Sequence, residues 1–235
     1  MPVQLKQASF DKTSSYIKEA MDSMIFDKKM LQLYAVTDRG FGNEDRLYAQ
    51  VEAALRGGVT MVQLREKHMD DKDFIEEARK IKMLTKAYHV PLIINDNIHV
   101  CVESEADGVH VGQSDMEAGH VREILGPDKI IGVTAKTPEQ ALAAQCAGAD
   151  YIGCGAVFGS STKLDTNKIS MEQLDAVCAA VNIPVVAIGG INRDNILQLK
   201  GHKMCGAAVV SALFAKENVE EAAKELLAKV REILE

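Results

Sequence analysis

Short runs of apolar, β-prone residues alternate with longer amphipathic segments along the chain from residue 31 onward. Most of the short runs are continuous, which is typical of parallel strands buried on both faces. They predict strands at Gln32–Val36, Met61–Leu64, Pro91–Ile94, Gly108–Val111, Ile130–Val133, Tyr151–Cys154, Val185–Ile188 and Ala207–Val210. The longer segments between these runs predict helices.

The clearest helical pattern is Asp71–Tyr88, where Phe74, Ala78 and Ile81 follow helical spacing and charged residues occupy the other faces. Further helices are predicted at Glu44–Arg56, Ile98–Ser104, Met116–Leu125, Pro138–Ala147, Met171–Val181, Arg193–Leu199 and Val219–Leu234. The sequence therefore reads as a series of strand–helix units, each about 26 residues long, close to the minimum for a βαβ repeat.

This alternation favours an α/β fold, a single (β/α)₈ TIM barrel over residues 31–235, because parallel crossovers wind right-handed and the length is typical of one barrel domain. A doubly wound open sheet uses the same alternation, but it would normally place a Gly-rich phosphate loop after its first strand. Here that strand is followed by Thr37, Asp38, Arg39 and Gly40, which do not form such a loop.

Residues 1–30 precede the barrel pattern and predict an N-terminal extension. Ile17, Met21, Met24 and Ile25 stand at helical spacing between charged residues, which favours a helix packed against the bottom of the barrel. A partly ordered tail is the alternative, since chain termini fray readily.

The composition is that of an ordinary globular protein, with 47% hydrophobic and 26% charged residues, which excludes disordered and collagen-like classes. Its 27 basic and 34 acidic residues give a net charge of −7, so the chain lacks the positive field on which nucleic-acid binding relies. Five cysteines without a C-x-x-C pair favour reduced thiols, and no apolar run approaches the ~18 residues of a membrane span. We therefore expect a cytoplasmic protein that binds neither nucleic acid nor membranes.

Polar, charged and glycine residues follow most of the predicted strands, where the loops of a barrel form its active site. They lie at Gln63–Lys67, Asn95, Asp96, Gly112–Asp115, Thr134, Gly155–Lys163, Gly189, Gly190 and Ser211. Taken singly, each has a structural explanation: Asp96 and Asp115 could be helix N-caps, Arg65 and Lys67 solvated charges beside Glu66. Unrelated features would scatter over both ends of the barrel, so their clustering favours a site.

The residue types at this rim indicate two phosphorylated ligands. Gly189, Gly190 and Ser211 follow the last two strands, where barrels often bind a phosphate. Arg65 and Lys67 would hold a second anionic group, by a forked pair of donors and a point charge. The carboxylates of Asp96 and Asp115 would repel each other unless a cation lay between them, which favours Mg²⁺ bridging to a diphosphate.

The usual sets of general bases and nucleophiles are missing from the predicted rim. His110 lies within the fourth strand and is predicted to be a core histidine with satisfied hydrogen bonds. Cys154, at the end of the sixth strand, has apolar neighbours that favour a packing role. A site rich in charge and poor in bases suits a reaction whose main need is to stabilise a leaving diphosphate.

Taken in this order, the segments resemble the thiamine-phosphate synthase family from about residue 31 to residue 213. The resemblance is carried by Tyr34–Asp38, Gln63–Lys67, Ile94–Asp96, Gly108–Asp115, Gly132–Thr134, Ser161–Lys163, Ala187–Ile191 and Val209–Ala212. It implies a small homo-oligomeric transferase whose substrates are small molecules, 4-amino-2-methyl-5-hydroxymethylpyrimidine diphosphate and a thiazole phosphate. Diphosphate would depart first, and the thiazole nitrogen would capture the pyrimidine methyl cation to give thiamine phosphate.

The resemblance also implies a role for each rim residue. The pyrimidine diphosphate would be bound by Gln63, Arg65, Glu66, Lys67, Asn95, Thr134 and Lys163. The thiazole phosphate would be bound by Ser160, Ser161, Thr162, Gly190, Val210 and Ser211. Asp96 and Asp115 would coordinate Mg²⁺, and Arg65 and Lys163 would act on the leaving diphosphate as catalytic residues.

The chain departs from the family pattern at three places. Thr134 replaces a Ser, Lys136 replaces a His, and the Gly155–Ser160 loop lacks the usual prolines, which leaves its backbone less restricted. Two alternatives stay open at this point: a thiazole tautomerase on the same barrel, whose family lacks the metal aspartates, and a non-catalytic barrel that binds a phosphoester.

Overall fold

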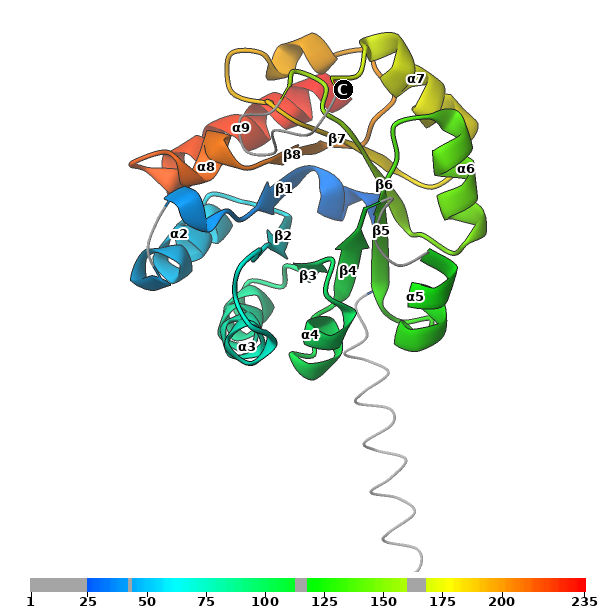
Figure 1. Ribbon diagram of the computed structural model, residues 1–235. Coiled ribbons are helices and arrows are strands. Elements are labelled where there is room, and N and C mark those ends of the chain that lie inside the picture. Colours follow the sequence, from blue (N-terminus) through cyan, green and yellow to red (C-terminus); the bar gives the residue numbers. More distant parts are fainter. Residues whose placement is uncertain (1–24, 42–43, 113–117, 160–167) are drawn as a thin grey trace, which may run out of the picture.

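Eight parallel strands form a closed barrel in the computed structural model, which describes residues 25–41, 44–112, 118–159 and 168–235. Each strand pairs with the next, and the last pairs with the first (Figure 1). The strands are β1 (Leu33–Val36), β2 (Met61–Leu64), β3 (Leu92–Asn95), β4 (Gly108–Val111), β5 (Ile130–Thr134), β6 (Tyr151–Gly155), β7 (Val185–Ile188) and β8 (Ala207–Val209). The predicted (β/α)₈ barrel is confirmed, with strand ends within one residue of the prediction.

Helices surround the barrel and connect successive strands (Figure 1). The α-helices are α2 (Glu44–Arg56), α3 (Asp71–Ala87), α4 (Ile98–Glu103), α5 (Ala118–Leu125), α6 (Pro138–Cys146), α7 (Met171–Ala180), α8 (Ser211–Phe214) and α9 (Val219–Leu234). Short 3₁₀ helices are η1 (Lys28–Leu31), η2 (Arg39–Phe41) and η3 (Ile196–Leu199).

The helix predicted at Arg193–Leu199 is wrong in length, because only the 3₁₀ turn η3 forms there. Two asparagine side chains bond to nearby backbone instead: Asn192 Oδ1 accepts from the N–H of Asp194 at 2.9 Å, and Asn195 Oδ1 accepts from the N–H of Asn192 at 2.8 Å. Such local bonds compete with the start of an α-helix.

Side chains of the strands alternate between the inside of the barrel and the layer beneath the helices. The interior cluster consists of Leu31, Tyr34, Val36, Met61, Ile93, Ile130, Tyr151, Val186 and Ala208. The outer layer is larger and includes Leu33, Ala35, Val62, Ile94 and Ile152, packed against the helices. Burial on both faces explains why the strands read as continuous apolar runs.

Glycines on β5 and β6 leave room inside the barrel for two rings. A Cβ at Gly132 would lie 2.1 Å from Cζ of Tyr151, and a Cβ at Gly153 would lie 2.9 Å from Cε1 of His110. Both distances are too short for real contacts. The interior therefore accommodates a large phenol and an imidazole because these two positions carry no side chain.

The residues just before β1 lie at the amino-terminal end of the barrel. Phe26 and Met30 pack against the interior cluster, and the Phe26 ring stacks on Tyr151 with a centroid distance of 6.0 Å. Of the predicted N-terminal extension, residues 1–24 lie outside the described residues. Ile25, one of its apolar positions, is 86% exposed.

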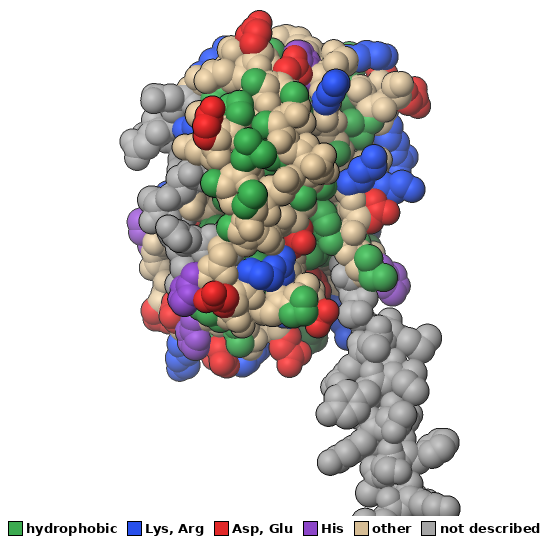
Figure 2. Space-filling view, turned by 90° about the vertical axis from the view of Figure 1, so that its right-hand side faces the viewer, with side chains coloured by type: hydrophobic (Ala, Val, Ile, Leu, Met, Phe, Trp, Pro, Cys, Tyr) green, Lys and Arg blue, Asp and Glu red, His purple; other side chains and the backbone are tan. Residues whose placement is uncertain are grey.

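The cysteines form no disulfides, as the sequence predicts, and the face shown in Figure 2 carries charges of both signs. All five cysteines are free, and burial raises the pKa of Cys154 to about 12, as expected for a packing residue. Acidic and basic side chains are interspersed on the face shown in Figure 2. In the ranges that the structure describes, no helix combines the length and the apolar character needed to span a membrane.

Gly108→Ala should destabilise the barrel, because the added Cβ would lie 2.0 Å from the carbonyl oxygen of Ile130 on the neighbouring strand. Overpacking of this kind costs about 1–3 kcal/mol of unfolding free energy. Gly119→Ala on α5 is the matched control, since its Cβ has no neighbour closer than 3.9 Å. Urea denaturation of both variants checks this; equal stability would contradict the packing of β4 on β5.

Candidate active site

Arg65 follows β2 at the carboxyl end of the barrel and is held there by Asp38, which follows β1. Arg65 Nη1 donates to Asp38 Oδ2 at 3.1 Å, and its backbone N–H donates to Oγ1 of the buried Thr37 at 3.0 Å. The two charged side chains are only 14% and 19% exposed, so the pair is partly shielded from water. The pair uses one of the five guanidinium N–H donors, which leaves capacity for an anion.

The Glu66 side chain is turned away from the solvent. It pairs with Arg39, and not with its sequence neighbours Arg65 and Lys67 as in the explanation by solvated charges. Glu66 Oε2 accepts from Arg39 Nε at 2.9 Å, and Arg39 also pairs with Glu77 of α3. The Glu66 side chain is 4% exposed, and its Oε1 is buried without a hydrogen-bond partner among the described residues. This position fastens the loop after β2 to α3, whereas Lys67 beside it is exposed.

Asn95 and Asp96 lie together where β3 ends. Asn95 Nδ2 donates to Asp96 Oδ2 at 2.5 Å, and the backbone N–H of Asp96 donates to the carbonyl of His110 at 2.9 Å. Asp96 has φ +63°, the left-handed region that non-glycine residues rarely occupy except at turns and functional sites.

The N-cap explanation for Asp96 is wrong, because the next residue caps the helix. Asn97 Oδ1 accepts from the N–H of Val100 at 2.9 Å at the start of α4. Asp96 itself is exposed. Its carboxylate therefore lies at the rim in a position that helix capping does not explain.

Gln63 on β2 and Thr134 on β5 are joined through the barrel interior. Gln63 Nε2 donates to the hydroxyl of Tyr34 at 2.6 Å, and that hydroxyl lies 2.9 Å from the hydroxyl of Tyr151. His110 completes the chain, with Nδ1 at 3.0 Å from Tyr151 and Nε2 at 2.9 Å from Thr134 Oγ1. Both nitrogens of His110 have partners, as predicted for a core histidine.

The loops after β6 and β7 pack tightly against each other. The N–H groups of Val157 and Phe158 donate to the carbonyls of Ile188 and Gly189, each at 3.0 Å. Gly190 has φ +68°, and a Cβ there would lie 2.4 Å from the carbonyl oxygen of Gly159. Glycine at position 190 is therefore required by both the backbone angle and the close approach of the neighbouring loop.

Val210 and Ser211 follow β8, the strand that pairs with β7, so they leave the sheet at the same end as Gly190. Both are partly buried, and Ser211 begins the short helix α8. The predicted residues Asp115, Ser160, Ser161, Thr162 and Lys163 lie outside the described residues. Among the residues that are described, no group of three or more His, Cys, Asp or Glu side chains could hold a metal by itself.

Sequence reasoning missed Asp38 and Arg39, the partners of Arg65 and Glu66. The signal available was the charged pair directly after the first strand, which stands where rim loops are expected. Neither ion pair could be assigned from the sequence, since each joins residues 27 positions apart.

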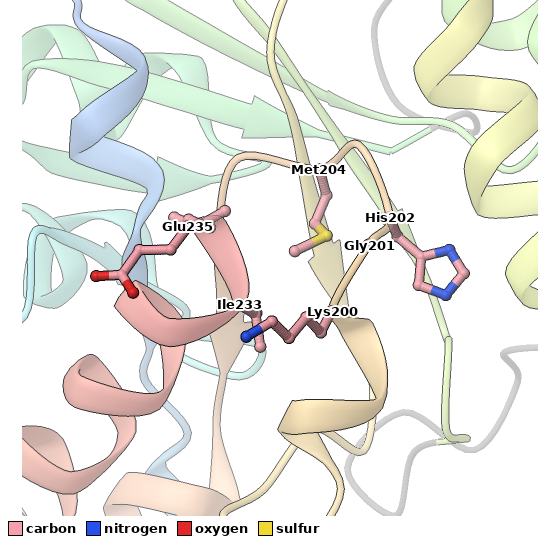
Figure 3. Close-up of a pocket in the computed structure, with 7 residues that line it drawn as sticks. Lys200, Gly201, His202, Met204, Ile233 and Glu235 are labelled. Atoms are coloured by element: carbon pink, nitrogen blue, oxygen red, sulfur yellow. The ribbon is translucent and has the colours of Figure 1, made fainter.

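A hollow of about 380 Å³ lies at the opposite end of the molecule (Figure 3). Its lining comes from the segment before β8 and from the C-terminal end of the chain at and after the end of α9: Lys200, Gly201, His202, Met204, Ile233, Leu234 and Glu235. It shares no residue with the rim described above. In a barrel the end that precedes the strands usually serves stability, so the rim is the candidate active site.

The chain is similar to proteins of one family over most of its length. A family model described as thiamine monophosphate synthase matches residues 33–213. The thiamine-phosphate synthases of Clostridium tetani and Ruminiclostridium cellulolyticum are 48% and 49% identical to this chain, over 83% of it and 93% of their own lengths. A solved thiamine phosphate pyrophosphorylase from Pyrococcus furiosus is 36% identical, with a TM-score of 0.81, and the match covers 88% of this chain and 99% of that one. The chain therefore belongs to the thiamine monophosphate synthase family.

Proposed function

We propose that the rim of this barrel transfers a 4-amino-2-methylpyrimidin-5-ylmethyl group from its diphosphate to the nitrogen of a thiazole phosphate. As a member of its family the chain is a transferase of thiamine biosynthesis. The observation that carries the site assignment is that the family motifs end at one rim. Gln63, Arg65, Asn95, Thr134 and Gly190 stand at or just beyond the carboxyl ends of β2, β3, β5 and β7.

Arg65 and Lys67 would hold the diphosphate. Arg65 is suited to this role because Asp38 and Thr37 already fix it at the rim, so less side-chain freedom is lost on binding. Its planar group offers directed donors to phosphate oxygens, and exposed Lys67 adds a point charge. Both would stabilise negative charge as it develops on the leaving diphosphate.

The proposal includes Mg²⁺ held by Asp96 and Asp115. The described part of this donor set fits the ion: the Asp96 carboxylate is an exposed hard oxygen donor at the rim, and helix capping does not use it. Mg²⁺ typically takes one or two carboxylates and completes its shell with water and substrate phosphates. When bound, it would neutralise charge on the leaving diphosphate.

Gly190, Val210 and Ser211 would receive the phosphate of the thiazole partner, next to the predicted contacts of Ser160–Thr162.

In the transfer, the bond between the methylene carbon and the diphosphate oxygen breaks, and its electrons leave with diphosphate. The lone pair of the thiazole nitrogen forms the new C–N bond, so no proton has to be removed. His110, whose two ring nitrogens contact Tyr151 and Thr134, fits a site without a general base.

The protein should form thiamine phosphate and diphosphate when it is incubated with both substrates and Mg²⁺. Omission of either substrate should abolish product, and EDTA should remove activity that added Mg²⁺ restores, since the metal would offset charge on the diphosphate. Chromatography of the products checks both statements. Turnover of a thiazole phosphate without the pyrimidine would favour an isomerase, and tight binding without product would favour a phosphoester-binding barrel.

Asp96→Asn should lower kcat by on the order of 100-fold while the melting temperature changes little, because the change removes a proposed metal ligand. Asn tolerates the left-handed backbone of residue 96, so the variant adds little strain. Asp128→Asn, an exposed position before β5 at the other end of the barrel, is the control. A clear fall in the melting temperature of Asp96→Asn, large enough for unfolding to explain the lost activity, would contradict the proposed role.

Arg65→Lys should raise the KM for the pyrimidine diphosphate by roughly 10- to 100-fold, because lysine loses the directed donors and the contact with Asp38. Asp38→Asn should have a smaller effect in the same direction, since Arg65 would remain but be held less firmly. Arg79→Lys on α3, where the side chain is 56% exposed, serves as control. Steady-state kinetics with each substrate varied decides; an unchanged KM in Arg65→Lys would exclude this contact.

A further inference from the structure

A continuous chain of hydrogen bonds crosses the interior of the barrel and joins two residues of the proposed site. From Gln63 it passes through Tyr34, Tyr151 and His110 to Thr134, and each of the four contacts is between 2.6 and 3.0 Å long. Its members lie on β2, β1, β6, β4 and β5, in that order. Because β2 and β5 are not neighbours in the barrel, no direct strand pairing connects the two ends.

The first bond gives the chain a direction. The amide nitrogen of Gln63 can only donate, so the Tyr34 oxygen accepts from it. Tyr34 and Tyr151 each carry one hydroxyl proton, and the arrangement that gives both protons an acceptor within the chain directs the Tyr34 proton to the Tyr151 oxygen and the Tyr151 proton to Nδ1 of His110. In that arrangement a neutral imidazole that accepts at Nδ1 carries its proton on Nε2, which lies 2.9 Å from Thr134 Oγ1.

The surroundings of the chain keep it in one arrangement. Burial raises the pKa of both Tyr34 and Tyr151, so the phenols keep the protons that the chain requires. The Tyr34 and Tyr151 rings pack edge to face at 6.0 Å, and the His110 ring lies 5.5 Å from that of Tyr151. Glycine at positions 132 and 153 is what leaves space for Tyr151 and His110.

We propose that Tyr34, Tyr151 and His110 are positioning residues that couple Gln63 to Thr134, so that both ends of the chain respond together to one bound ring. A partly or wholly buried polar chain of this kind is cooperative, because each bond polarises the next. An aminopyrimidine offers an amino donor and ring-nitrogen acceptors, and the two ends would meet these groups with matched polarity. This role for the ligand rests on the proposed function, whereas the coupling itself is a property of the free protein.

The coupling can be tested without ligand by ¹⁵N NMR of the histidine side chains, with His110 assigned by its loss in His110→Asn. We expect a protonated Nε2 and a hydrogen-bonded, unprotonated Nδ1. Gln63→Met, which removes the first donor, should shift the Nδ1 resonance although two tyrosines lie between. In the Tyr151→Phe background, Gln63→Met should no longer shift it, because the chain is cut.

Tyr48→Phe on α2 is the matched control, since this tyrosine is 45% exposed and belongs to the outer surface. It should leave the His110 resonances unchanged. Tyr34→Phe is a second way to cut the chain and should act as Tyr151→Phe does. A proton on Nδ1, or a Gln63→Met shift of equal size with and without the Tyr151 hydroxyl, would overturn the proposal.

Binding of the pyrimidine diphosphate in the presence of Mg²⁺ tests what the coupling does for the site. Gln63→Met and Thr134→Val should each weaken binding by about tenfold, as expected for one lost hydrogen bond, but the double variant should lose clearly less than the product of the two. In the Tyr151→Phe background the two factors should multiply. If the double variant still lost less than the product of the two factors in the Tyr151→Phe background, the ligand and not the chain would couple the two residues. That result would overturn the positioning role.

The two proposals fail in different ways. Absence of pyrimidine diphosphate binding by the unaltered protein would overturn the proposed function and the role of the chain in substrate binding, while the NMR cycle would still decide the coupling. Normal binding with independent effects of Gln63→Met and Thr134→Val would leave the proposed function standing and remove the further inference.

Discussion

The pairing of β1 with β8 is the constraint on which the site depends. It joins Leu33 to Ala207 and Ala35 to Val209, and it closes the sheet so that every strand ends at the same rim. Residues that are far apart in the sequence, such as Arg65 and Gly190, are brought to that rim by closure and not by any contact of their own. An open sheet with the same strands would spread them along an edge.

Closure also limits what the interior can contain. An eight-stranded barrel is filled by side chains in layers, so a polar group inside it must find its partner among the other interior residues. Here apolar Met61 and Ile93 fill part of the space, and the hydrogen-bonded chain through Tyr34 and Tyr151 fills another part. Tyr34 and Tyr151 therefore serve two purposes: their rings pack in the barrel interior, and their hydroxyls belong to the polar contacts that orient Gln63.

The sequence was sufficient for the barrel but not for the pairings at its rim. Continuous apolar runs and their spacing predicted the eight strands, because burial on both faces leaves a strong pattern. The N-cap explanation for Asp96 failed because Asn97 has the same capping chemistry one residue later, and because the backbone of Asp96 is bonded to His110 on the next strand. The partners of Arg65 and Glu66 follow from strand order and loop geometry, which no local pattern encodes.

Two of the acidic side chains that contribute to the net charge of −7 pair with arginines at the rim. Asp38 accepts a hydrogen bond from Arg65 and fixes the direction of the guanidinium donors, so in the proposed anion site it would orient Arg65 and not cancel its effect. Glu66 acts similarly on Arg39 and secures the loop that carries Arg65. In the proposed site an acidic chain would present directed donors to a diphosphate, because local hydrogen-bond geometry, and not the summed charge of the molecule, would determine how the anion is held.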